Sequence, residues 1–117
     1  MARLFHYLGT CSTCQRIMKE IPGLDRFTLR EIKGEPLTSK ELDALKALAG
    51  SYEALFSRRA MKFRQMGLHE RQLTEKDYRD LILQEYTFLK RPVMVADGRI
   101  FIGSSRKVVE EMVAAGA

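Results

Sequence analysis

The chain has 117 residues, 45% of them hydrophobic, so it is long enough for one hydrophobic core and too short for two comfortable domains. Lys and Arg number 20 against 15 Asp and Glu, a formal charge of +5 that favours anionic partners without by itself implying nucleic acid. No apolar run is long enough to span a bilayer, and residues 1–8 carry no signal-peptide core, so we expect a monomeric cytoplasmic protein that contacts neither membrane nor nucleic acid.

The first two predicted elements meet at a turn that holds both cysteines of the chain. Residues 4–8 form a short apolar, aromatic-rich run typical of a strand, and Gly9 and Thr10 end it. Residues 14–21 have the pattern of a helix, which Pro22 stops. The C-x-x-C sequence is therefore predicted at a strand-to-helix junction.

This junction favours thiol chemistry at Cys11 and Cys14. The first turn of a helix presents unpaired N–H groups and the positive end of the helix dipole, and both favour a thiolate over a thiol. We therefore expect Cys11 to be acidic and nucleophilic. The i, i+3 spacing brings the second sulfur close, so a disulfide can close once Cys11 has been attacked or oxidised. Cys14 is then the resolving thiol.

Other uses of a cysteine pair fit this sequence less well. A structural zinc site usually needs four soft ligands, whereas this chain offers one pair plus His6 and His69, which lie far apart in the sequence. A structural disulfide needs an oxidising compartment and usually spans a longer loop, and two inert buried cysteines would not need this turn. A redox-active pair is the favoured interpretation, and we expect no metal.

A second strand is predicted over residues 27–32, where apolar and β-branched residues precede the turn sequence Lys33-Gly34-Glu35-Pro36. Together with the first strand and helix it forms a βαβ unit, for which parallel pairing through a right-handed crossover is the default. The cysteines then lie at the carboxyl end of the first strand, where open α/β sheets place their sites.

The middle of the chain, residues 37–89, contains helical patterns and no convincing strand. Thr38 to Glu41 form a capping-box sequence that opens a helix, and Gly50 ends it. Residues 60–66 have a second helical pattern, and a third helix is predicted to begin at Thr74. This segment is therefore predicted as a helical insertion in an α/β frame.

The last elements are a hairpin and a helix. Residues 93–96 and 100–102 are apolar runs joined by Asp97-Gly98, which suits a two-residue turn. Ser104 or Ser105 can then cap a final helix. The predicted order is βαβ, then helices, then ββα.

Three segments of this α/β chain carry a resemblance to a known family: Gly9–Cys14, Ser57–Phe63 and Lys90–Val95. Over nearly its whole length the chain resembles the arsenate reductase (ArsC)/Spx-like proteins of the thioredoxin-fold superfamily. The resemblance implies one thioredoxin-like domain over residues 1–117, with a mixed four-stranded sheet and a helical insertion at about residues 37–89 between strands 2 and 3.

The resemblance also implies roles for particular residues. The cysteine matching Cys11 is the family's nucleophile, and members with a second cysteine place it where Cys14 stands. Arg91 matches an oxyanion-binding arginine, and Pro92 is expected to be cis and close to the nucleophile. Thr10, beside Cys11 in the same motif, is counted with the substrate- and anion-binding residues.

A further arginine of the family lies in mid-chain and fits Arg59 best, although Arg58 next to it leaves the register open. The chemistry agrees with these assignments, because a guanidinium is a fixed fork suited to tetrahedral oxyanions and lowers the pKa of a nearby thiol.

The chain also differs from glutaredoxin-linked arsenate reductases. These use one working cysteine, a third arginine where this chain has Gly103-Ser104, and a histidine where it has Tyr7. His6 is one position away and would point to the other face of the strand, so we expect a core or surface histidine. His69 is expected to be a solvated loop residue.

The function implied is a thiol-disulfide oxidoreductase that binds no cofactor but uses glutathione as a co-substrate, or glutaredoxin or thioredoxin as electron donor. The alternative is an Spx-like redox regulator that binds the α-subunit of RNA polymerase. Gly50 lies near a partner-contacting glycine of that group, but its preferred interpretation is a helix cap. A thioredoxin-like module that has lost its activity is also left open.

Overall fold

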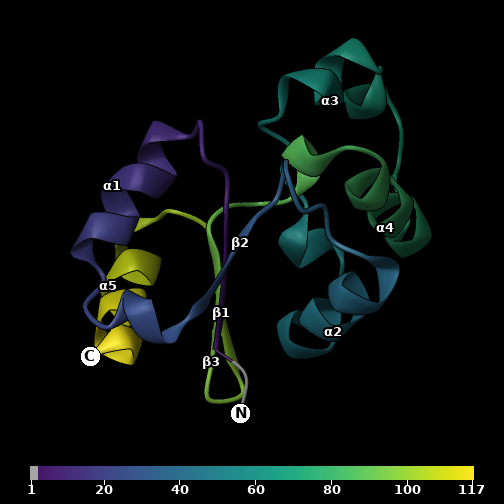
Figure 1. The fold of residues 1–117 in the computed structure, drawn as a ribbon. Coiled ribbons are helices and arrows are strands. Elements are labelled where there is room, and N and C mark those ends of the chain that lie inside the picture. Colours follow the sequence, from purple (N-terminus) through teal and green to yellow (C-terminus); the bar gives the residue numbers. More distant parts are fainter. Residues whose placement is uncertain (1–2) are drawn as a thin grey trace. The chain divides into compact units, whose positions relative to one another are not determined.

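The computed structural model describes residues 3–117, which form two compact units (Figure 1). One unit is built from the two ends of the chain, up to Pro36 and from Arg91 onwards, and it contains the sheet. The other unit, Leu37–Lys90, is made of helices and turns. The predicted helical insertion between the second and third strands is thus confirmed, whereas its membership of a single domain stays a prediction.

The sheet unit contains four short strands in the spatial order β2-β1-β3-β4. They are β1 (Leu4–Tyr7), β2 (Thr28–Glu31), β3 (Val93–Ala96) and β4 (Arg99–Ile102). β1 pairs in parallel with β2 and antiparallel with β3, and β3 pairs antiparallel with β4. Asp97 and Gly98 join β3 to β4 with φ angles of 53° and 78°, as a tight hairpin turn requires. The mixed four-stranded sheet is therefore as predicted.

Two helices lie on one face of this sheet, α1 (Ser12–Glu20) and α5 (Arg106–Gly116) (Figure 1). Phe5, Met94 and Phe101 are neighbours across three strands, and all three are buried beneath these helices. Ile17 of α1 and Met112 of α5 complete the cluster without any exposed surface. Burying each large apolar side chain contributes about 1.5–3 kcal/mol, so this face anchors α1 against the sheet.

The helices of the helical unit are capped at their ends and joined by short turns. Its elements are α2 (Ser39–Ala49), η2 (Glu53–Leu55), α3 (Met61–Gln65), η3 (Leu68–Glu70), α4 (Glu75–Gln84) and η4 (Tyr86–Phe88); η1 (Leu24–Arg26) belongs to the sheet unit. Thr38 caps α2 and Thr74 caps α4, and each forms a complete capping box with the acidic residue three positions on. Gly50 ends α2 in the left-handed conformation, with φ of 94°.

Aromatic side chains form the core of the helical unit. Phe56 is fully buried, and its ring centroid lies 5.1 Å from that of Phe88, 4.9 Å from that of Tyr78 and 6.0 Å from that of Phe63. Phe56 also forms an isolated antiparallel bridge with Leu89. None of the helices in residues 3–117 is long and apolar enough to cross a membrane.

Candidate thiol site

Cys11 lies at the junction between β1 and α1. A tight turn ends the strand, because the N–H of Cys11 donates to the carbonyl of Leu8 at 3.1 Å. α1 begins at Ser12, so Cys11 is its N-cap residue, and the Cys11 carbonyl accepts from the N–H of Gln15 at 3.1 Å. The helix starts two residues earlier than its apolar spacing predicted, since the first turn of a helix need not contain apolar residues.

The surroundings of the Cys11 sulfur favour the thiolate. The residue is half-buried, and burial alone would raise the pKa of its thiol. The backbone N–H of Cys14, the Cys14 thiol and the Arg91 guanidinium together outweigh burial and lower the pKa of Cys11 below its ordinary value.

Cys14 has the opposite character. Its side chain has no exposed surface, and burial raises the pKa of its thiol to about 11. The N–H of Leu8 opposes this rise, whereas the hydrogen bond to Cys11 and the charge of that neighbour add to it. Both cysteines are free thiols in the structure. At neutral pH Cys14 therefore remains protonated and can donate to the Cys11 sulfur.

The segment before β3 places Arg91 beside Cys11. The Arg91–Pro92 peptide bond is cis, as the resemblance implied. Val93 pairs with His6 in antiparallel register, so the two preceding residues run toward the carboxyl end of β1, where the cysteine turn begins. Pro92 is buried, and its carbonyl accepts from the N–H of Gly103 at 2.9 Å. Arg91 thus reaches the Cys11 sulfur and lowers its pKa by a hydrogen bond and by its charge.

The other predicted anion-binding residues are exposed. Thr10 lies in the turn that precedes Cys11. Arg59 lies in the helical unit, in the loop before α3, and its role toward the thiols stays a prediction. Arg58 donates to the Glu53 carboxylate and to the Tyr78 hydroxyl, both at 2.7 Å. Arg58 is therefore engaged inside the helical unit, and the match of Arg59 to the family's mid-chain arginine stays a prediction.

One residue of this site, Glu31, was not singled out from the sequence. It ends β2, and one carboxylate oxygen accepts from the N–H of Gly9 at 2.7 Å. The other oxygen accepts from the N–H groups of Lys33 and Gly34 at 3.0 and 2.6 Å. The turn is also held from the helix side, where the Gln15 side-chain amide donates to the Gly9 carbonyl at 2.8 Å. The only signal in the sequence was an acidic residue directly before a turn.

Neither histidine lies among these groups. His6 is 2% exposed and belongs to the interior, on the face of β1 opposite Phe5. His69 is an exposed residue, as predicted, and lies in the short turn η3 with its ring 6.4 Å from that of Phe63. In residues 3–117 no three His, Cys, Asp or Glu side chains are grouped as metal ligands would be.

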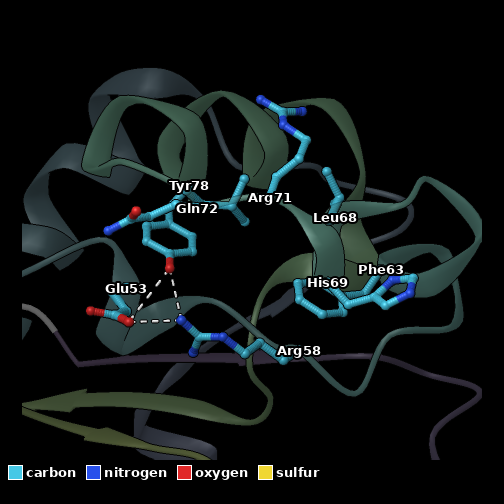
Figure 2. Close-up of a pocket in the computed structure, with 9 residues that line it drawn as sticks. Glu53, Arg58, Phe63, Leu68, His69, Arg71, Gln72 and Tyr78 are labelled. Carbon is cyan, nitrogen blue, oxygen red and sulfur yellow. Dashed lines mark hydrogen bonds and ion pairs between the residues drawn. The ribbon is translucent and has the colours of Figure 1, made fainter.

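The helical unit contains a pocket of about 580 Å³ (Figure 2). It is lined by Glu53, Arg58, Phe63, Leu68, His69, Arg71, Gln72, Leu73 and Tyr78, and by neither cysteine. Figure 2 shows Arg58, Glu53 and Tyr78 meeting at one side of the pocket, while Arg71 extends away from them. At that side the Arg58 guanidinium and the Glu53 carboxylate neutralise one another.

Two thiols at the end of β1, a cis-proline before β3 and helices over a β2-β1-β3-β4 sheet define a thioredoxin-like fold. A sequence model of the ArsC family matches residues 6–112, and the chain belongs to that family. No curated protein matches the chain.

Several solved structures are similar over almost the full length. An ArsC family related protein from Bacteroides fragilis is 25% identical, with a TM-score of 0.77, over 96% of this chain and 99% of that one. An arsenate reductase (ArsC) related protein from Brucella melitensis is 23% identical, with a TM-score of 0.71, over 95% and 93% of the two chains. An arsenate reductase from Vibrio cholerae is 16% identical, with a TM-score of 0.72, over 98% of each chain. The last two likenesses establish the fold alone.

Proposed function

We propose that the protein is a thiol-disulfide oxidoreductase in which Cys11 is the nucleophile and Cys14 the resolving thiol. The observation that carries the proposal is the unequal placement of two neighbouring thiols: Cys11 is half-buried at the N-cap of α1 beside Arg91, whereas Cys14 has no exposed surface. These surroundings lower the pKa of Cys11 and raise that of Cys14 to about 11. Such a separation supplies one thiolate that attacks and one thiol that holds its proton until the first has reacted. Family membership supports the same assignment.

With a mixed disulfide as substrate, the reaction takes two balanced steps. The Cys11 thiolate attacks one sulfur of the substrate, and the other sulfur leaves as a thiolate that takes up a proton. Cys14 then loses its proton and attacks the Cys11 sulfur, which forms the internal disulfide and releases the second substrate thiol. The substrate gains two electrons and the cysteine pair loses two.

An oxyanion such as arsenate fits the same site. Cys11 would displace one arsenate oxygen as water, forming a sulfur–arsenic bond, while Arg91 balances the charge of the remaining oxygens. Attack of Cys14 or glutathione on the Cys11 sulfur then forms a disulfide and leaves two electrons on arsenic as arsenite. The resemblance adds Thr10, Pro92 and Arg59 as further anion-binding candidates in this proposal.

The oxidised pair must be reduced again by an external donor of two electrons. Two glutathione molecules, or the dithiol of a glutaredoxin or thioredoxin, supply them and become disulfides. The alternative is an Spx-like regulator, in which the same cysteine pair acts as a redox switch and the protein binds the α-subunit of RNA polymerase. The cap geometry accounts for Gly50 without such a partner, so the enzyme is the preferred proposal.

The test is turnover of two substrates, a glutathione mixed disulfide and arsenate, each with glutathione plus glutaredoxin and separately with thioredoxin. Wild type should turn over at least one substrate, Cys11→Ser should be inactive, and Cys14→Ser should depend on added glutathione. Equal turnover by wild type and Cys11→Ser would contradict the proposal. Absence of turnover together with co-purification of RNA polymerase would favour the regulator.

A further inference from the structure

The Glu31 carboxylate joins two segments that flank the thiol site. One oxygen takes the N–H of Gly9, 22 residues away, and the other takes two N–H groups of the turn after β2. The Gly9 and Gly34 N–H groups are the main causes that lower the pKa of Glu31, so the side chain is ionised at neutral pH.

The register of the sheet explains why the side chain at this position reaches the cysteine turn. Glu31 lies directly opposite Tyr7, the last residue of β1, and the N–H of Ile32 donates to the Tyr7 carbonyl at 2.9 Å. Two residues after Tyr7, at Gly9, the chain has left the sheet and turns into α1. The carboxylate meets it there, between the end of the strand and Cys11.

We propose that Glu31 is a positioning residue for the thiolate: by holding Gly9 it fixes the turn that keeps the Cys11 sulfur among its donors. This inference rests on the proposed function, because it concerns the same nucleophile. Cys11 is held to that turn through its N–H bond to Leu8, and Gly9 is held on its other side by Gln15. Loss of the Glu31 contact releases one side of the turn while the helix side stays tied.

The two possible effects of Glu31 have opposite signs, which makes the inference testable. As a charge alone, a carboxylate near a thiolate disfavours the thiolate, so its removal should lower the pKa of Cys11. As a positioning group it keeps the sulfur near Arg91 and the Cys14 N–H, so its removal should raise the pKa of Cys11. An amide cannot replace it fully, because its single oxygen can accept only for one of the two segments.

The experiment measures the rate of Cys11 alkylation by iodoacetamide between pH 5 and pH 10, with peptide mass mapping, in wild type, Glu31→Gln and Glu31→Ala. Glu75 provides the matched control, since its exposed carboxylate accepts from the N–H groups of Tyr52 and Glu53 at 2.7 and 3.1 Å in the helical unit. Amide exchange of Gly9, followed by NMR, reports the turn itself.

We expect both Glu31 variants to be alkylated about 2- to 10-fold more slowly at pH 6, the fold-change that corresponds to one net hydrogen bond, and to match wild type at high pH. Gly9 should exchange faster, and Glu75→Gln should behave as wild type. If the pKa of Cys11 is low in wild type and stays the same or falls in both Glu31 variants, the inference is overturned and the proposed function still stands. An ordinary pKa for Cys11 in wild type overturns both.

Discussion

Substitution of Arg91 should impair thiol acidity and oxyanion turnover more than it impairs folding. Arg91→Ala removes a hydrogen bond and a positive charge that both lower the pKa of Cys11, so that pKa should rise. The same change removes the guanidinium that is proposed to hold an incoming anion. Two observables, thiol acidity and oxyanion turnover, should therefore move together in this variant.

The size of the effect follows from the kind of contact that is lost. A hydrogen bond to a charged group is worth about 1.5–3 kcal/mol, which corresponds to roughly 10- to 150-fold in affinity or rate. Arg91 is only half-buried, so water screens part of its charge, and the lower end of the range applies. We expect a loss of about 10- to 30-fold in kcat/KM for an oxyanion substrate. Arg91→Lys keeps the positive charge but loses the planar guanidinium, so its kcat/KM should lie between those of wild type and Arg91→Ala.

Arg106 provides the control for this comparison. Its side chain is 94% exposed in α5, and its only ion pair in the described part of the chain is an i, i+4 contact with Glu110 at 3.4 Å. The assays are the pH profile of Cys11 alkylation, steady-state turnover and urea unfolding of Arg91→Ala and Arg106→Ala. An Arg91 variant that matches the control in acidity and turnover would refute the reasoning.

The remaining predictions concern the two thiols and one helix cap. Iodoacetamide at neutral pH should label Cys11 before Cys14, and the reverse order would exchange their roles. Mild oxidation should remove two hydrogens from the intact mass of wild type, whereas Cys14→Ser should give a mixed disulfide or sulfenic acid; an unchanged mass would count against a working pair. Because burial raises the pKa of Cys14 from 9.0 to about 11, the stability of the reduced protein should be retained below pH 9 and fall as the pH rises through 11. Urea titrations should show a flatter alkaline limb in Cys14→Ser. Thr38→Ala should cost about 1 kcal/mol of unfolding free energy, and an unchanged urea midpoint would contradict the capping box.

Much of the fold was predictable because its signals are local. The Asp97-Gly98 turn, the cap at Thr38 and the cap at Ser105 each act within four residues, and the structure confirms all three. The neighbours of a strand are a different matter, because they depend on residues far along the chain. The patterns predicted two of the three pairings, β1 with β2 and β3 with β4, and the resemblance predicted one mixed sheet; the pairing of β1 with β3 came only from the structure.

The site divides in the same way. Cys11 and Cys14 were found from a motif and its placement, and Arg91 from a resemblance. Glu31 escaped because its contacts join a side chain to backbone N–H groups, one of them 22 residues away. Every residue except proline has a backbone N–H group, so the sequence does not show which carboxylate will accept from it. Only the pairing of β1 with β2 brings Gly9 and this carboxylate together.

The different acidities of the two cysteines can be traced to the period of a single helix. Cys14 and Ile17 are three positions apart, so they share the buried face of α1, and the C-cap residue Ile21 is buried four positions further on. Cys11 precedes the first turn and is not carried inward by that period. Cys14 is therefore buried, whereas Cys11 is exposed to the hydrogen-bond donors of the first helical turn. The direction of the helix thus decides which cysteine is the proposed nucleophile and which the resolving thiol. Moving the apolar face of α1 by one residue would leave the C-x-x-C sequence intact and still remove the burial that raises the pKa of Cys14.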